Sequence, residues 1–152
     1  MPETIYDALR ESHERQRKLC RALLRTPPRS DQRVATFTEL RIELAANAAA
    51  EERFLYAPML MEDAGLLSAR HALHEHHEID EIVEDMQKRD KNGAGWMARA
   101  RALSKEVHHH LKEEESKFFQ MSGKVLSKTQ KEKSARQYRR DFARMKKTLE
   151  AG

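Results

Sequence analysis

Histidine and glutamate follow one another closely in the segment V-H-H-H-L-K-E-E-E-S-K-F-F at residues 107–119. A helix returns to the same face after three or four residues, so His110 and Glu114 lie one turn apart on one side of it. That side also carries the apolar residues Leu103, Val107 and Phe118. Burying ionisable groups among apolar ones costs several kcal/mol unless they are paired or bind a metal ion. The segment therefore predicts a metal-binding pair.

Three further segments have an apolar face that polar side chains interrupt. In chain order these faces consist of Ile5, Leu9, His13, Gln16, Cys20 and Leu23; Phe37, Leu40, Leu44, Asn47, Glu51 and Leu55; and Ala72, His76, Ile79, Val83 and Met86. His13 and His76 come early in their segments, whereas Glu51, like Glu114, comes late. The late part of a helix lies level with the early part of its antiparallel neighbour, so these side chains are expected to meet in one layer.

Breaker residues divide the chain into the elements that position these side chains. T-P-P-R-S at 26–30, A-P at 57–58 with D-A-G at 63–65, and D-K-N-G-A-G at 90–95 separate segments of helical periodicity, and Ser30 is a suitable N-cap. Helices are predicted at 3–25, 31–56, 66–89, 95–121 and 127–149. We expect an all-α protein, with an antiparallel up-down four-helix bundle at 1–126 and an additional C-terminal basic helix at 127–152.

The converging side chains form a plausible ligand set for a metal ion, and they are His13, Glu51, His76, His110 and Glu114. Imidazole and carboxylate together suit iron, manganese or zinc. His77 and His109 are the main alternatives to His76 and His110, and His74 is a weaker alternative to His76. Asn47 is expected to hydrogen-bond to a ligand rather than to bind the metal itself. Tyr56 is interpreted as a packing residue, with a hydrogen bond near the site as the alternative.

With these ligands and the phrases around them, the sequence resembles the hemerythrin-like family of HHE cation-binding domains. The matching phrases are S-H-E-R-Q-R with His13, A-E-E-R-F-L-Y-A-P with Glu51, E-H-H-E-I-D-E-I-V with His76, and H-H-H-L-K-E-E-E-S-K-F-F with His110 and Glu114. They occur in the family's order, from residue 3 to about residue 127. The resemblance implies a four-helix bundle with a non-haem iron centre, mononuclear or dinuclear, with zinc and manganese as alternatives.

Two positions depart from the family's pattern. Asn47 stands where the motif on the second helix would have a histidine, one turn before Glu51. Ala72 stands where oxygen carriers of this family have a further histidine, one turn before His76. Two imidazoles of a carrier's ligand set are therefore replaced, which argues against a reversible oxygen carrier.

The leading hypothesis is thus a metal-binding protein of hemerythrin-like type that acts in oxygen, redox or iron sensing or storage. Its expected partners are metal ions, with dioxygen as a further candidate. One alternative is a small di-iron enzyme that handles peroxide or nitric oxide. Another is an interaction module that has lost its metal.

Composition and charge bear on the remaining classes. The sequence has no apolar run long enough to span a membrane and no apolar stretch typical of a signal peptide near its start, so we expect a cytoplasmic protein without a membrane partner. The single Cys20 is consistent with a reducing compartment.

The C-terminal segment differs in charge from the rest of the chain. Residues 122–152 hold ten Lys and Arg but three Asp and Glu, in a chain of net charge +4. An apolar stripe runs along this segment at Tyr138, Phe142, Met145 and Leu149. The stripe predicts packing on the bundle itself, with docking between the subunits of a homodimer as the alternative. Nucleic acid is a weaker candidate, because no recognised binding motif accompanies the charge.

Overall fold

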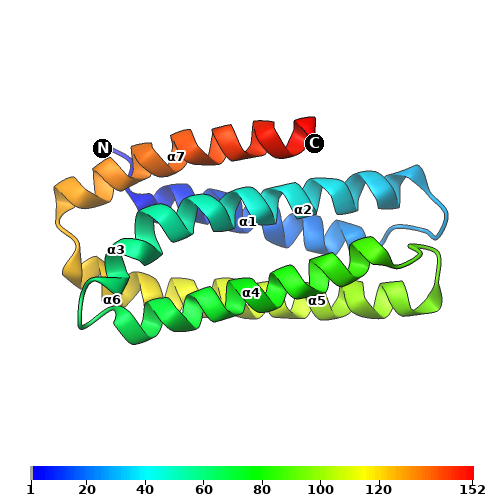
Figure 1. The fold of residues 1–152 in the computed structure, drawn as a ribbon, viewed down its shortest axis with the longest axis horizontal. Coiled ribbons are helices and arrows are strands. Elements are labelled where there is room, and N and C mark those ends of the chain that lie inside the picture. Colours follow the sequence, from blue (N-terminus) through cyan, green and yellow to red (C-terminus); the bar gives the residue numbers. More distant parts are fainter. Residues whose placement is uncertain (1) are drawn as a thin grey trace.

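The computed structural model describes residues 2–152, and most of them are helical (Figure 1). The elements are α1 (Ile5–Leu24), α2 (Asp31–Glu51), the π-helical turn η1 (Glu52–Tyr56), α3 (Ala57–Leu60), α4 (Leu66–Lys88), α5 (Ala94–Glu113), the π-helical turn η2 (Glu114–Phe118), α6 (Phe119–Val125) and α7 (Lys128–Ala151). The described residues include no strand, so the prediction of an all-helical protein is confirmed. None of the helices in residues 2–152 is long and apolar enough to cross a membrane.

Three helices, α1, α2 and α7, begin with a side-chain cap close to the predicted helix boundaries. The Thr4 hydroxyl accepts a hydrogen bond from the Asp7 N–H at the start of α1. The Ser30 hydroxyl does the same for Arg33 at the start of α2, and Ser127 caps α7. Each cap satisfies an N–H group that has no partner inside its own helix, which fixes where the helix begins.

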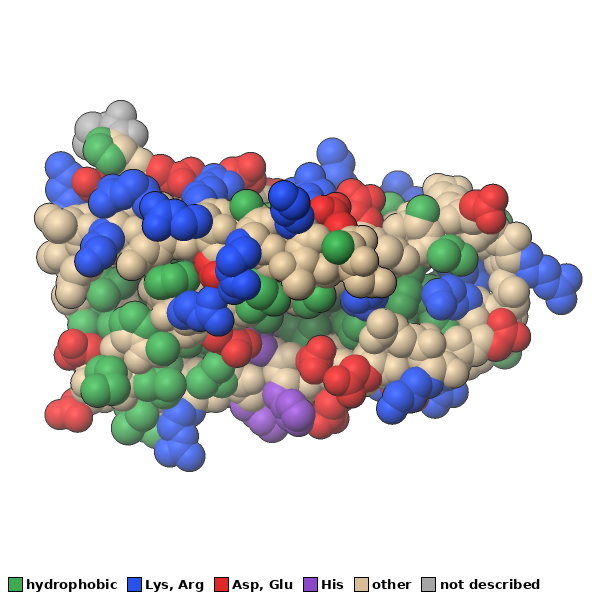
Figure 2. Space-filling model, turned by 45° about the horizontal axis from the view of Figure 1, so that its top comes forward, with side chains coloured by type: hydrophobic (Ala, Val, Ile, Leu, Met, Phe, Trp, Pro, Cys, Tyr) green, Lys and Arg blue, Asp and Glu red, His purple; other side chains and the backbone are tan. Residues whose placement is uncertain are grey.

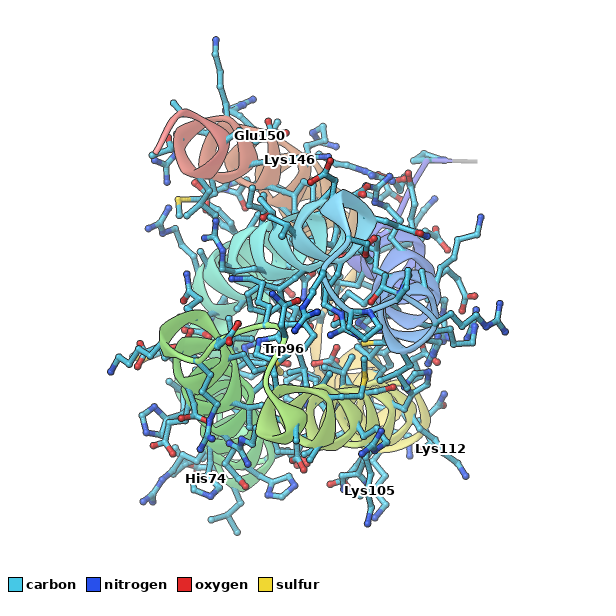
Figure 3. All side chains as sticks on the ribbon, turned by 90° about the vertical axis from the view of Figure 1, so that its right-hand side faces the viewer. His74, Trp96, Lys105, Lys112, Lys146 and Glu150 are labelled. Atoms are coloured by element: carbon cyan, nitrogen blue, oxygen red, sulfur yellow. The ribbon has the colours of Figure 1, made fainter. Side chains whose placement is uncertain are left out.

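The long helices run back and forth along the long axis of the molecule. In Figure 1, α1 and α4 run in one direction, and α2 and α5 return in the other. The fifth long helix, α7, lies on the outside and packs against α1 and α2 of the same chain. Viewed along the axis in Figure 3, Lys146 and Glu150 lie on this outer helix, whereas Trp96 lies among the other helices.

The helix that starts with α2 continues past the predicted break at Ala57–Pro58 and ends at Leu60. The reason lies in η1, where the Ala57 N–H bonds to the Glu52 carbonyl, five residues earlier. This wide turn changes the hydrogen-bond pattern immediately before Pro58, which stands in the first turn of α3, where its missing N–H is tolerated.

A second wide turn, η2, connects α5 to α6, and the helix runs to Val125 instead of ending at residue 121. Here the Phe119 N–H bonds to the Glu114 carbonyl. Because a π turn holds more residues than an α turn, it rotates the residues that follow it. Phe119 and Ser122 are therefore buried, whereas Met121, which the regular spacing placed inside, is only partly buried.

The interior contains two apolar clusters, one toward each end of the bundle. The Trp96 cluster consists of Cys20, Leu23, Phe37, Leu40, Leu44, Ile79, Val83, Met86, Trp96, Ala100, Leu103, Val107 and Leu111. The Met59 cluster consists of Ile5, Ala8, Leu9, Ala50, Leu55, Tyr56, Met59, Ala69, Ala72, Phe118, Phe119 and Tyr138. Polar residues separate the members of one cluster from those of the other along α1, α2 and α4, and Glu114 does so where α5 continues into η2.

Candidate metal centre

The polar residues between the two clusters form one buried layer. Each of the predicted ligands is at most 9% exposed, and these residues are His13, Glu51, His76, His110 and Glu114. They come from α1, the end of α2, α4, the end of α5 and the first residue of η2. The structure therefore brings all of them to the level that the helical spacing predicted.

The donor atoms of this layer form two groups that share Glu51. One group is Glu51, His76 and His110, and the other is His13, Glu51 and Glu114, with the donor atoms of each group within 4.8 Å of one another. Nε2 of His76 lies 3.3 Å from Oε1 of Glu51. Nε2 of His13 lies 3.0 Å from Oε1 of Glu114. A carboxylate common to two donor groups is in a position to bridge two cations.

Each of the three imidazoles is held from its other nitrogen by a carboxylate. The pairs are His13 Nδ1 with Glu115 Oε2 at 2.6 Å, His76 Nδ1 with Glu52 Oε2 at 2.8 Å, and His110 Nδ1 with Glu75 Oε1 at 2.8 Å. An Nδ1–H that donates to a carboxylate fixes the orientation of the ring and leaves Nε2 as the inward-facing atom. Metal-binding histidines are usually oriented in this way.

Several inward-facing atoms of the layer have no hydrogen-bond partner among residues 2–152. They are Oε2 of Glu51 and Nε2 of His110, together with Nε2 of His13 and Oε1 of Glu114, which lie 3.0 Å apart but not in hydrogen-bond geometry. Leaving a buried polar atom without a partner costs about 1–3 kcal/mol, and more if the group is charged. A cation accepts electron pairs from imidazole nitrogen and carboxylate oxygen at once, so a bound metal ion would satisfy these atoms together. The donor set fits a metal ion.

Without a cation, the negative charges of Glu51 and Glu114 would repel each other in the buried layer. Burial raises the pKa of Glu51 well above its usual value, and the nearby Glu114 raises it further. Burial also opposes the charge of Glu114, but His13 and His110 outweigh it and hold the pKa of Glu114 below its usual value. Burial lowers the pKa of His13, whereas Glu114 and Glu115 raise it more, to about 9. A cation between the two central carboxylates would remove this conflict.

Tyr56 takes part in the layer, although the sequence was interpreted to give it a packing role. Its hydroxyl donates a hydrogen bond to Oε2 of Glu114 and lies 3.5 Å from Nε2 of His76. The wide turn η1 explains the difference, because it brings Tyr56 as well as Leu55 to the inner face. Burial raises the pKa of Tyr56, and Glu114 raises it further, so the hydroxyl retains its proton.

Asn47 connects the shared carboxylate to the C-terminal helix. Its Nδ2 donates to Oε1 of Glu51 at 3.4 Å, and its Oδ1 accepts from the Tyr138 hydroxyl at 2.6 Å. In this geometry Asn47 contacts Glu51 by a hydrogen bond and belongs to neither donor group. The stripe that contains Tyr138 was interpreted as packing alone, so its contact with Asn47 was missed.

The alternative histidines lie outside the layer, and His74 is exposed beside Glu78. The side chain of His77 is 66% exposed and lies 2.6 Å from Glu81. That of His109 is 61% exposed and lies 3.1 Å from Glu113. In the structure, His76 and His110 hold the inward positions.

Sequence reasoning also missed the carboxylates that hold the imidazoles. Each stands directly beside a predicted ligand in the chain: Glu52 follows Glu51, Glu75 precedes His76, and Glu115 follows Glu114. Such a neighbour points sideways from its helix, which lets it reach the histidine of an adjacent helix. An acidic residue next to three of the five predicted ligands was the available signal.

A groove between α2 and α4 leads from the surface to the layer. It has a volume of about 480 Å³, and Ala45, Ala48 and Ala49 form much of its α2 side. These small side chains leave the groove open, and it extends to His76 and His110. Figure 2 shows a hollow on this face with histidine side chains beside it. The groove offers a small molecule a route to one donor group.

Comparison with known proteins identifies the family and supports the fold. The model of the family described as the hemerythrin HHE cation binding domain matches residues 4–122. The fold is similar to that of a crystal structure of a hemerythrin HHE cation binding domain-containing protein from Mycobacterium kansasii. The TM-score is 0.85 at 20% sequence identity, covering 95% of this chain and 88% of the other. Among curated proteins, no sequence match is found.

Proposed function

We propose that this chain, which belongs to the hemerythrin HHE cation-binding family, is a non-haem iron protein with one iron ion in each donor group and Glu51 between them. The observation that carries the proposal is the set of buried, inward-facing atoms without partners, divided into two groups that share one carboxylate. Membership of the family supports cation binding. The nature and number of the ions are our inference.

The donor types suit iron and argue against a structural zinc site. Structural zinc sites are closed and rich in cysteine, whereas Glu51, His76 and His110 form a set of two imidazoles and one carboxylate. That set is typical of non-haem iron with open coordination positions. The replacement of a family histidine by Asn47, which hydrogen-bonds to Glu51 instead, also leaves room at the centre.

We assign the centre to oxygen or redox sensing or to iron storage, with dioxygen as a candidate ligand. Bound iron would supply electron exchange with a small oxidant. The protein's own contribution is access through the groove between α2 and α4, exclusion of water by the two apolar clusters, and fixed imidazole rings. A small peroxidase or nitric-oxide-handling enzyme is the second candidate. The protonated Tyr56 hydroxyl beside Glu114 and His76 favours it, because it places a proton donor at the centre.

The proposal is tested by comparing two buried glutamates of α2. Glu51 belongs to both donor groups, whereas Glu43 is equally buried but accepts hydrogen bonds from Ser12 and Arg15, away from the layer. Protein would be loaded anaerobically with Fe(II), freed of excess metal and analysed for iron. We expect about two irons per chain in wild type and in Glu43→Gln, and well below one in Glu51→Gln.

Circular dichroism would check that both variants remain folded. Full iron occupancy in Glu51→Gln would exclude Glu51 as the shared ligand. A wild-type chain that binds no iron under these conditions would favour the metal-free interaction module instead.

A further inference from the structure

A third group of imidazoles and carboxylates lies outside the buried layer, between α4 and α5. Nε2 of His71 lies 2.8 Å from Oε1 of Glu113 and 3.5 Å from Oε2 of Glu75. The donor atoms of these three residues all lie within 4.8 Å of one another. Nε2 of His109 lies 3.1 Å from Oε2 of Glu113 and 3.5 Å from Oε2 of Glu75. We call these four residues the outer cluster.

The outer cluster differs from the ordinary surface pairs nearby. On α4, His74 pairs with Glu78 and His77 pairs with Glu81, each one turn further along the same helix. The outer cluster instead joins the His71–Glu75 pair of α4 to the His109–Glu113 pair of α5. Cross-helix convergence of this kind provides several donors for one ion, which a single pair on one helix face does not.

A pocket connects the outer cluster to the buried layer. It has a volume of about 220 Å³, and its walls include His71, Glu75 and Glu113 as well as His110 and Glu114. His71 is half-exposed, whereas His110 and Glu114 are buried. Nε2 of His110 and Oε1 of Glu114 are among the buried atoms without hydrogen-bond partners in the described chain. The pocket therefore extends from the exposed donors to two predicted ligand residues of the buried layer.

Two features keep this passage continuous. Ala72 lines the pocket, and its small side chain leaves space that a longer one would fill. Glu75 has one oxygen in each region, because Oε1 accepts from His110 Nδ1 at 2.8 Å while Oε2 faces His71 and His109. A cation at the outer cluster would therefore bind Glu75, the carboxylate that also orients His110 in the inner centre.

We propose that His71, Glu75 and Glu113, with His109 beside them, form an outer site that binds a divalent metal ion and passes it through the pocket to the buried centre. Imidazole and carboxylate are suitable donors for Fe²⁺, Mn²⁺ or Zn²⁺. The outer site is more exposed than the inner one and binds more weakly, as a loading site requires. Binding at the outer site stands by itself, whereas delivery rests on the proposed function of the buried centre.

Zinc binding in the Glu51→Gln background tests the outer site, because this substitution removes the shared inner ligand. Equilibrium dialysis against Zn²⁺ would compare this variant with versions that also carry His71→Ala or His74→Ala. His74 is the matched control, since it lies on the outside of the same helix and has its own glutamate partner (Figure 3). We expect affinity for zinc to fall at least tenfold with His71→Ala and to stay unchanged with His74→Ala. Equal affinity in all three proteins would overturn the outer site.

The rate of iron uptake tests whether the outer site delivers metal to the buried centre. Anaerobic Fe(II) would be mixed with wild type, His71→Ala or His74→Ala, and free iron would be trapped with a chelator at successive times. We expect uptake to slow several-fold in His71→Ala alone, with the same final iron content in all three. Lost zinc binding with unchanged iron uptake would overturn delivery while the outer site stands. Zinc binding at the outer site in a wild-type chain that takes up no iron would refute the proposed iron centre and, with it, delivery.

Discussion

The Trp96 cluster and the buried layer stand on the same long helices, but they differ in what completes them. In the Trp96 cluster apolar side chains pack on one another, and even the indole N–H of Trp96 donates to the Met86 carbonyl at 3.0 Å. In the layer, imidazole and carboxylate atoms face one another with several partners missing. From this difference we infer that folding alone completes the cluster, whereas a bound cation would complete the layer.

The same contrast separates stability from binding. Buried ionisable groups often stabilise a fold less than apolar residues of similar size would. The layer is therefore better explained by what it binds than by what it adds to the free energy of unfolding. Substitutions in the Trp96 cluster should then lower the free energy of unfolding, whereas substitutions in the layer should change metal binding.

The largest effect on stability is expected from Leu103→Ala in the Trp96 cluster. Leu103 is fully buried, and shortening it leaves a cavity among close-packed neighbours. The free energy of unfolding should fall by about 2–5 kcal/mol. Urea denaturation would measure the loss, and the iron content of the folded protein should not change. A proportional fall in iron content would mean that the layer depends on this cluster, and the contrast between the regions would fail.

A smaller effect is expected from Tyr138→Phe, which removes the hydrogen bond to Asn47. Tyr6→Phe is the matched control, because its hydroxyl bonds to Ser122 at 2.8 Å, in the Met59 region. Each substitution should cost about 1 kcal/mol of stability. Only Tyr138→Phe should release iron to a chelator several-fold faster, because Asn47 then holds Glu51 less firmly. Equal release rates would show that α7 has no influence on the centre.

Helical spacing was sufficient to predict the level and burial of the proposed ligands. His13, Glu51, His76, His110 and Glu114 lie on helix faces whose members recur at intervals of three or four, and regular α-helix turns each face inward as far as these residues. The choice of His76 over His77 followed from Ile79 and Val83 on the same face.

Other features depend on contacts that a spacing rule does not contain. The wide turns η1 and η2 rotate the helices just beyond Glu51 and Glu114, which moves Tyr56 inward and Met121 outward. The bond from Tyr138 to Asn47 depends on how α7 lies across α1 and α2. The pairing of each histidine with a carboxylate on another helix depends on the packing of four helices at once.

X-ray absorption spectroscopy of the iron-loaded wild-type chain would test the central claim most directly. Two donor groups that share Glu51 place two metal ions close together, so the spectrum should show nitrogen and oxygen ligands and a second iron at roughly 3.5–4 Å. Glu43→Gln should give the same spectrum. An iron environment without a neighbouring iron, at full occupancy of one ion per chain, would contradict a shared dinuclear centre.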